Sequence, residues 1–291
     1  MGALSFQLHP ITVAAVLLSL IAYPLLCSTG VKKERPLSLA GRFESGLKHS
    51  TAREKRFFFF GLLALFVANY WPLADMAEHD LLLARMLQQL IITLAAAPFL
   101  LQAIPKSSIV ALTKPRLLDL VLAYLTRPLL AVVIFTITAV LAMTPAMVAF
   151  EISSVWREQL IHLALLAAAL LAWIPILRVL PGIRQLSTPG RLAYLFVLSL
   201  LPTTPAIVLI FARRVLYTSY SHTALGLNPV ADQQLTGALA KIASLAVFWG
   251  VAIAILLRAD RDEELGQDPD PITWDDVKRE LDRSAKRFPQ G

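Results

Sequence analysis

The sequence has little charge and almost no cysteine. Aspartate, glutamate, lysine and arginine make up 16% of its 291 residues, whereas soluble domains carry about 25%. The single cysteine, Cys27, excludes an intramolecular disulfide. Long stretches have no charge at all, and hydrophobic residues make up 57% of the chain. This composition excludes an ordinary soluble domain and indicates that lipid surrounds most of the chain.

The motifs of several enzyme classes are also absent. The sequence has no glycine-rich phosphate loop, no His-Glu-x-x-His helix, no Cys-x-x-Cys pair and no nucleophile elbow. Nothing supplies a nucleophile beside a base, so we expect no enzymatic activity. A haem held by two histidines needs both at matched depth, and only His162 lies clearly within an apolar segment. We therefore do not expect an electron carrier either.

Seven apolar segments have the length of transmembrane helices. A helix needs about 20 mostly apolar residues to cross roughly 30 Å of hydrocarbon. We predict spans at about residues 9–30, 57–74, 81–104, 128–149, 159–180, 191–213 and 236–258. Leu117–Tyr124 is apolar enough to be an interfacial segment before the fourth span. The predicted fold is all-α, a polytopic transmembrane helix bundle over residues 1–258.

Basic residues between the spans predict the direction of the chain. Twenty-two lysines and arginines lie in four regions: segments 31–56 and 105–127, the turn around Arg184 and the tail from Arg258. The alternate loops contain only three. Loops rich in lysine and arginine stay in the cytoplasm, so we predict an outer N-terminus and a cytoplasmic C-terminus. The same distribution explains the net charge of +7 without a nucleic-acid partner. The first span lacks a basic segment before it, so we expect it to be retained rather than cleaved.

Residues 259–291 are predicted to form a cytoplasmic tail. Asp260–Asp270 is an acidic, turn-rich linker. Thr273 and Asp276 have the spacing of a capping box, and the apolar residues that follow share one face of a short helix: Trp274, Val277 and Leu281. This helix either packs on the cytoplasmic rim of the bundle or docks a partner.

Polar residues within the spans gather towards the predicted outer side. The third span carries three of them on one helix face, and the fifth and seventh spans add others at similar depth. The set is Arg85, Gln88, Gln89, His162, Asp232, Gln233 and Lys241. Because polar groups facing lipid are costly, we predict that they meet in one cluster inside the bundle. Lys241 lies deepest, so we expect it to pair with a carboxylate, Glu158 or Asp232.

The same outer half contains the candidate metal ligands. Every methionine except the initiator falls there, and thioether and imidazole groups suit copper, particularly Cu(I). The candidates are His162, Met86 and Met143. A methionine in an apolar helix is more often a packing residue than a metal ligand. A histidine within a span is a ligand in some proteins and not in others. Both interpretations stay open.

Four blocks of the sequence resemble a known family. They are Arg85–Leu90 followed by Ala97–Leu101 and Pro105; His162 with Trp173-Ile174-Pro175; Tyr217–Tyr220; and Asp232-Gln233-Gln234 with Gly237 and the charged exit Arg258–Glu264. In this order, over about residues 57–262, the chain resembles the caa3-type cytochrome c oxidase assembly factors called CtaG. Two family histidines correspond to Arg85 and Gln89 here, which implies a divergent member.

The resemblance implies a multi-pass protein of the bacterial inner membrane that helps to assemble a haem-copper cytochrome c oxidase. Its partners would be oxidase subunits and the lipid bilayer. Its role would be either Cu(I) handover through Met86, Met143 and His162 or metal-free scaffolding. Arg85 and Lys241 would repel a bound cation by about 4 kcal/mol per charge pair at 4 Å. The alternative is a small-molecule or metal-ion transporter that uses the outer polar cluster, which requires polar groups through the full depth of the membrane.

Overall fold

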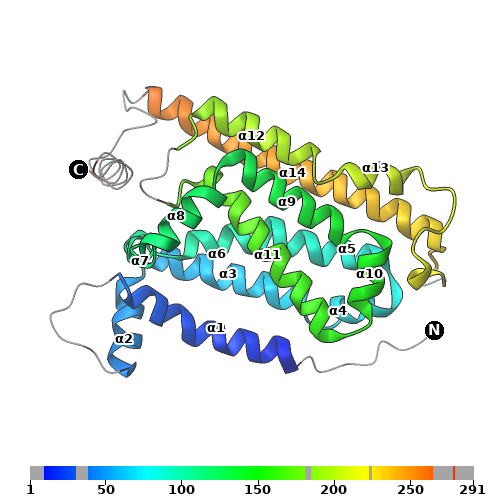
Figure 1. Cartoon of the computed structure of the whole chain (residues 1–291), viewed down its shortest axis with the longest axis horizontal. Helices are drawn as coiled ribbons and strands as arrows, with labels where there is room; N and C mark the ends of the chain where they lie inside the picture. Colours follow the sequence, from blue (N-terminus) through cyan, green and yellow to red (C-terminus); the bar gives the residue numbers. More distant parts are fainter. Residues whose placement is uncertain (1–9, 31–38, 181–184, 223–224, 265–277, 279–291) are drawn as a thin grey trace, which may run out of the picture.

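All described elements are helices, as the sequence predicts. The structure is a computed structural model that describes residues 10–30, 39–180, 185–222, 225–264 and 278. The long helices lie roughly along one direction, and successive ones reverse it (Figure 1). One end of the bundle carries α7 (Lys106–Leu112) and α8 (Arg116–Leu125), and the other carries α4 (Leu73–Asp75) and α10 (Pro145–Ile152).

Four helices are long and apolar enough to cross a membrane. They are the helix Leu82–Ala103, α11 (Val155–Leu177), the helix Thr188–Ile210, and α14 (Pro229–Glu264). Two bent pairs bring the number to six. The first joins α3 (Ala52–Ala68) to Leu73–Asp80 at 45°, and the second joins α8 to α9 (Pro128–Ala142) at 76°. The remaining predicted span corresponds to α1 (Pro10–Ser28), which is apolar but shorter. Four to six of the seven predicted spans are thus supported, and their direction stays a prediction.

Prolines divide two of the long helices. Leu82–Ala103 consists of α5 (Leu82–Leu90), a π-helical segment η2 (Ile91–Ala96) and α6 (Ala97–Ala103). Thr188–Ile210 consists of α12 (Thr188–Leu200) and α13 (Thr204–Ile210), which meet at the sequence Pro202-Thr-Thr-Pro205. Proline lacks a backbone N–H and interrupts the helical hydrogen bonds. The remaining short helices are α2 (Leu39–His49), η1 (Met76–Asp80) and η3 (Thr218–Tyr220).

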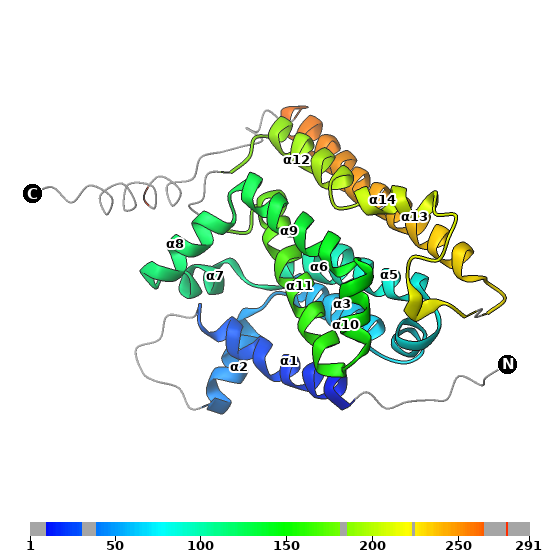
Figure 2. The same cartoon turned by 45° about the vertical axis from the view of Figure 1, so that its right-hand side comes forward.

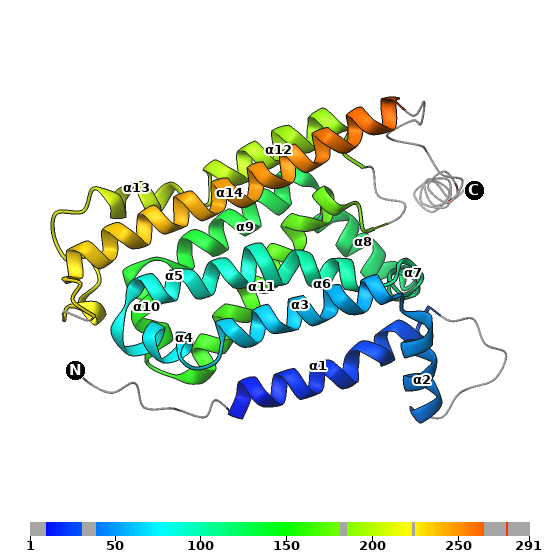
Figure 3. The same cartoon turned by 180° about the vertical axis from the view of Figure 1, so that it is seen from behind.

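The bundle has a layered order. Seen from behind, α12, α13 and α14 form one side, α5, α6 and α3 lie in the middle, and α1 with α2 covers the opposite side (Figure 3). The turned view separates the α12–α14 side from α9 and α11, which lie below it in the picture (Figure 2). The middle layer therefore contacts both sides, and it carries the polar block that begins at Arg85.

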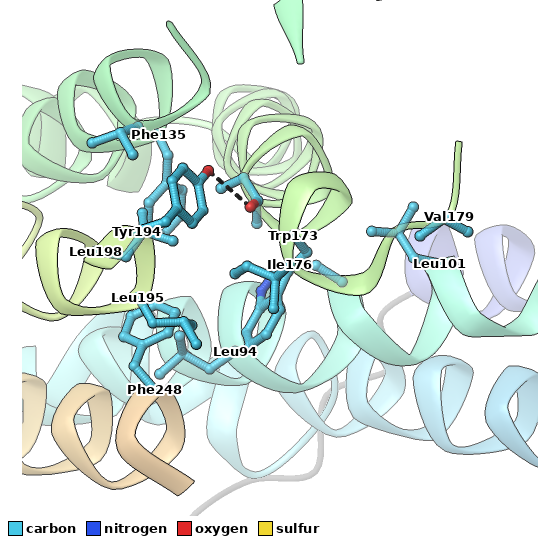
Figure 4. Packing of buried hydrophobic residues seen from close by; sticks show 14 of the residues in the cluster. Leu94, Leu101, Phe135, Trp173, Ile176, Val179, Tyr194, Leu195, Leu198 and Phe248 are labelled. Carbon is cyan, nitrogen blue, oxygen red and sulfur yellow. Dashed lines mark hydrogen bonds between the residues drawn. The ribbon is translucent and has the colours of Figure 1, made fainter. Parts of the chain in front are cut away.

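The largest apolar core fills the bundle towards the end that carries α7 and α8. Trp173 lies beside Phe248 with ring centroids 5.7 Å apart, and Tyr194 and Leu198 pack nearby (Figure 4). The hydroxyl of Tyr194 donates to the carbonyl of Ala172 over 3.0 Å. These contacts join α11, α12 and α14 into one packed interior.

A side chain donates a hydrogen bond to a backbone carbonyl of the π-helical segment η2. In η2 the amide of Ala97 donates to the carbonyl of Ile92, five residues back. The next donor in that register would be Pro98, which has no N–H, so the carbonyl of Thr93 lacks a helical partner. The indole Nε1 of Trp173 donates to this carbonyl over 2.8 Å.

Some predicted boundaries differ from the structure. The predicted span 128–149 is two helices, because Thr144 caps a new helix, α10, that starts with Pro145. The last helix continues to Glu264, so the first five residues of the predicted linker Asp260–Asp270 are helical. The predicted tail helix with Trp274, Val277 and Leu281 lies outside the described residues.

Candidate functional site

The N-terminus of α5 is capped by a carboxylate from α14. Asp232 accepts hydrogen bonds from the backbone amides of Leu82 at 2.8 Å and Leu83 at 3.0 Å. The preceding residue, Leu81, offers no side-chain cap, so Asp232 satisfies amides that would otherwise be orphaned. Asp232 is only 3% exposed. This pair of bonds fixes the start of α5 against the start of α14.

One turn further along α5, Arg85 forms a buried ion pair with Glu151 of α10. Its Nε also donates to the hydroxyl of Tyr220 over 3.0 Å, and that hydroxyl donates in turn to the carbonyl of Ala77. Burial raises the pKa of Tyr220 above its usual value, which keeps the phenol protonated as a donor. Arg85 therefore joins three segments that are distant in the sequence.

His162 of α11 lies beside this network. Its Nδ1 is 2.7 Å from Oδ1 of Asn69, the residue that ends α3. Because the Asn69 amide nitrogen donates to Leu65, its Oδ1 is the acceptor and the Nδ1 of His162 carries the proton. The carbonyl of Ala68, the residue before Asn69, accepts a hydrogen bond from Gln88 of α5, so His162 lies near the polar face of α5. We call Arg85, Glu151, His162, Tyr220 and Asp232 the polar cluster.

The two glutamines of the α5 block hold neighbouring backbone. Gln88 donates to the carbonyl of Ala68 over 2.7 Å, and Gln89 donates to the carbonyl of Ala139 over 3.3 Å. Gln88 is fully buried. These contacts fasten α5 to the end of α3 and to α9, so both side chains have a positioning role.

Gln233 holds the loop that carries Tyr217 and Tyr220. Its Oε1 accepts from the amides of Leu216 at 2.7 Å and Tyr217 at 3.1 Å, and its Nε2 donates to the carbonyl of Arg214 over 3.2 Å. The Asp-Gln sequence thus performs two tasks. Asp232 caps α5, and Gln233 orients the loop that delivers Tyr220 to Arg85.

Lys241 makes contacts outside the polar cluster. Its Nζ donates to the carbonyl of Ser199 at 3.4 Å and to the hydroxyl of Thr203 at 3.3 Å, where α12 ends before Pro202. The expected carboxylate partner, Glu158 or Asp232, is replaced by the end of a helix. Carbonyls in the last turn of a helix carry partial negative charge, which attracts an ammonium group.

The candidate thioether ligands lie together, but His162 does not lie with them. Met86 and Met143 line a cavity of about 40 Å³ between α5, α9, α13 and α14, together with Gln89. Among the described residues that line it, His162 does not appear. Met143 also accepts a hydrogen bond at its carbonyl from the hydroxyl of Tyr217. Met86 and Met143 therefore border one small space.

The polar cluster does not have the ligand chemistry of a metal site. In the part of the chain that the structure describes, no group of three or more histidine, cysteine, aspartate or glutamate side chains is arranged to hold a metal ion. The positive charge at the centre of the cluster belongs to Arg85, which already binds Glu151. A metal cation beside it would be repelled.

Sequence reasoning missed two members of this cluster, Glu151 and Tyr220, and it missed Asn69, the partner of His162. The sequence does contain a sign of the role of Glu151, because it is the one acidic residue between Asp119 and Glu158. Tyr220 lies in a block whose pattern gives no indication of its partner. Asn69 ends α3 and reaches His162 only through the folded bundle.

Comparison with known families gives one match. A model described as cytochrome c oxidase caa3 assembly factor (Caa3_CtaG) matches residues 38–262. The matched region runs from just before α2 to the last turn of α14 and contains the whole polar cluster. No match was found among curated proteins or among solved structures.

Proposed function

Because the chain belongs to the cytochrome c oxidase caa3 assembly factor family, we propose that it is an integral membrane assembly factor for a haem-copper cytochrome c oxidase. We further propose that it acts in a bacterial inner membrane as a scaffold for oxidase subunits and holds no metal of its own. The family indicates a non-catalytic role.

The scaffolding role is supported chiefly by the ion pair between Arg85 and Glu151. This pair supplies the cluster with its own fixed cation, where a metal-handling protein needs open ligands. The neighbouring contacts of Asp232 and Tyr220 are hydrogen bonds to backbone groups or to Arg85. Such a network fixes the relative positions of α5, α10 and α14 and so maintains a defined surface for a partner.

A second candidate, Cu(I) handover, is favoured by one observation. Met86 and Met143 line the same cavity, and thioethers are ligands for Cu(I). In this proposal Cu(I) would bind in the cavity without His162 as a ligand. It remains a separate proposal, because it uses different residues from the polar cluster.

The transporter alternative is less well supported. A transported polar solute needs polar groups along its whole path. The core around Trp173, Leu195 and Phe248 is apolar and closely packed (Figure 4). No continuous polar path is evident among the described residues of that core.

A deletion strain tests the proposal. We expect deletion to lower the amount of active oxidase and re-expression of the wild-type chain to restore it. The oxidase that still forms should contain its normal copper per haem. Normal oxidase activity in the deletion strain would overturn the assembly role, whereas residual oxidase depleted in copper would favour the Cu(I) candidate.

A further inference from the structure

Helix α8 exposes five large apolar side chains. None of its described side chains is buried. The large apolar residues that are 43–76% exposed are Leu117, Leu118, Leu120, Val121 and Tyr124. In water such a surface would be unfavourable, at about 25 cal/mol for each Å² of apolar area. The surroundings of α8 must therefore be at least partly apolar.

The length and direction of α8 fit the boundary of a membrane rather than its interior. Its 10 residues extend about 15 Å, roughly half of the hydrocarbon thickness. It bends by 76° from α9, which begins three residues later at Pro128. If α9 crosses the membrane, α8 lies close to the membrane plane.

Exposed cations stand at both ends of α8. Lys114 precedes the helix, and Arg127 follows it with its guanidinium 5.0 Å from the ring centroid of Tyr124. The starts of α3 and α7 lie at the same end of the bundle (Figures 1 and 3). They carry further exposed basic residues: Arg53, Lys55, Arg56 and Lys106. A tyrosine with an adjacent arginine is typical of the headgroup region. The charge at this end complements an anionic surface.

We propose that α8 lies in the headgroup layer and that Lys114 and Arg127 bind the phosphate groups of anionic phospholipids. The apolar residues of α8 enter the upper acyl region, while the two cations mark the two ends of the lipid contact. This surface is distinct from the polar cluster, which lies at the opposite end of the bundle (Figure 1). The proposal does not depend on the assembly function.

The chain offers a matched control at its other end. Arg157 lies over the ring of Phe150 at 4.6 Å and is exposed, so it repeats the arginine–aromatic geometry of Arg127. It is one of only three basic residues in the loops predicted to lie outside. Arg157→Gln removes one exposed cation from an arginine–aromatic pair, as Arg127→Gln does, without touching α8.

The first test measures the thermal stability of the purified full chain in detergent during titration with phosphatidylglycerol or phosphatidylcholine. Phosphatidylglycerol should raise the Tm more than phosphatidylcholine does, for wild type and for Arg157→Gln. The double variant Lys114→Gln/Arg127→Gln should lose at least half of this difference. An equal response to both lipids in wild type, or a full difference in the double variant, would overturn the proposal.

A second test measures depth and does not depend on lipid affinity. Leu120 and Ile137 are similarly exposed, at 49% and 53%, but lie on α8 and α9. After Cys27→Ala, spin labels at Leu120→Cys and Ile137→Cys are compared in vesicles by their accessibility to oxygen and to a water-soluble nickel complex. The label on α8 should lie near the phosphates and the label on α9 deep in the acyl region. Equal depth would contradict the proposed position of α8.

Discussion

Arg85 on α5 and Glu151 on α10 form an ion pair in which each side chain is only 3% exposed. Removing two charges from water is costly, and their attraction compensates only when hydrogen bonds satisfy the remaining polar atoms. The hydroxyl of Tyr220 supplies one such bond to Arg85. The pair therefore holds α10, a short helix, against the long helices.

Removing one member of this pair should be strongly destabilising. Arg85→Met leaves Glu151 buried without its cation, so we expect a loss of about 3–5 kcal/mol in the free energy of unfolding. Arg85→Met/Glu151→Gln leaves no uncompensated charge and should be less destabilised than Arg85→Met alone. Thermal unfolding of the purified variants in detergent measures both. Additive effects of the two substitutions would show that the residues do not act as a pair.

The cap of α5 predicts a graded series at Asp232. Asp232→Ala removes both acceptors from the amides of Leu82 and Leu83, and we expect it to cost about 1–2 kcal/mol. Asp232→Asn keeps one oxygen acceptor and should cost less. Hydrogen exchange at the first turn of α5 should increase in the same order. If both variants exchange like wild type, the cap does not stabilise this turn.

The position of Lys241 predicts opposite effects for two substitutions. Lys241→Met removes a half-buried charge from a predicted span, and a charge near the middle of a span costs about 3 kcal/mol. This substitution does not leave the backbone carbonyl of Ser199 without a donor, because the hydroxyl of Thr203 also donates to it. The Tm should stay level or rise. Lys241→Glu places a negative charge beside the helix C-terminus and should lower the Tm. Equal losses in both variants would show that the charge of Lys241 has no role there.

Tyr217 predicts a loss of stability at alkaline pH. Burial raises the pKa of this phenol from 10 to about 12 in the folded chain. The folded state keeps a proton that the unfolded state loses above pH 10, so this contribution is complete below pH 10 and disappears as the pH rises through about 12. Tyr217→Phe should therefore show a shallower decline in Tm between these values.

Tyr124→Phe serves as the control for this titration, because Tyr124 is 56% exposed. Its decline in Tm should match that of wild type. If the Tm of Tyr217→Phe declines with pH as steeply as that of wild type, the loss of stability at alkaline pH comes from other groups.

The sequence predicts the long helices and the polar face of α5 well, because both depend on local pattern. Apolar length identifies the spans, and the spacing of Arg85, Gln88 and Gln89 places them on one face. The division of the fourth span was missed, although Thr144-Pro145 is a helix-start signal. That error hid Glu151, since a residue beyond a span was treated as a loop residue.

The partner of Lys241 was missed for a different reason. A buried charge was expected to need an opposite charge, but a broken helix offers carbonyl groups that serve instead. Pro202 and Pro205 carry the signal for this break. The pairing of His162 with Asn69 depends on how α3 and α11 pack, and no local pattern specifies that contact.

The most direct test of metal-free scaffolding is the oxidase activity that a ligand-free variant restores to the deletion strain. The triple variant Met86→Leu/Met143→Leu/His162→Gln removes every candidate metal ligand and keeps Arg85 and Glu151. At matched protein levels, verified by immunoblot, we expect it to restore oxidase activity close to the wild-type level. Failure of this variant to restore activity would contradict the account and favour a role for bound metal.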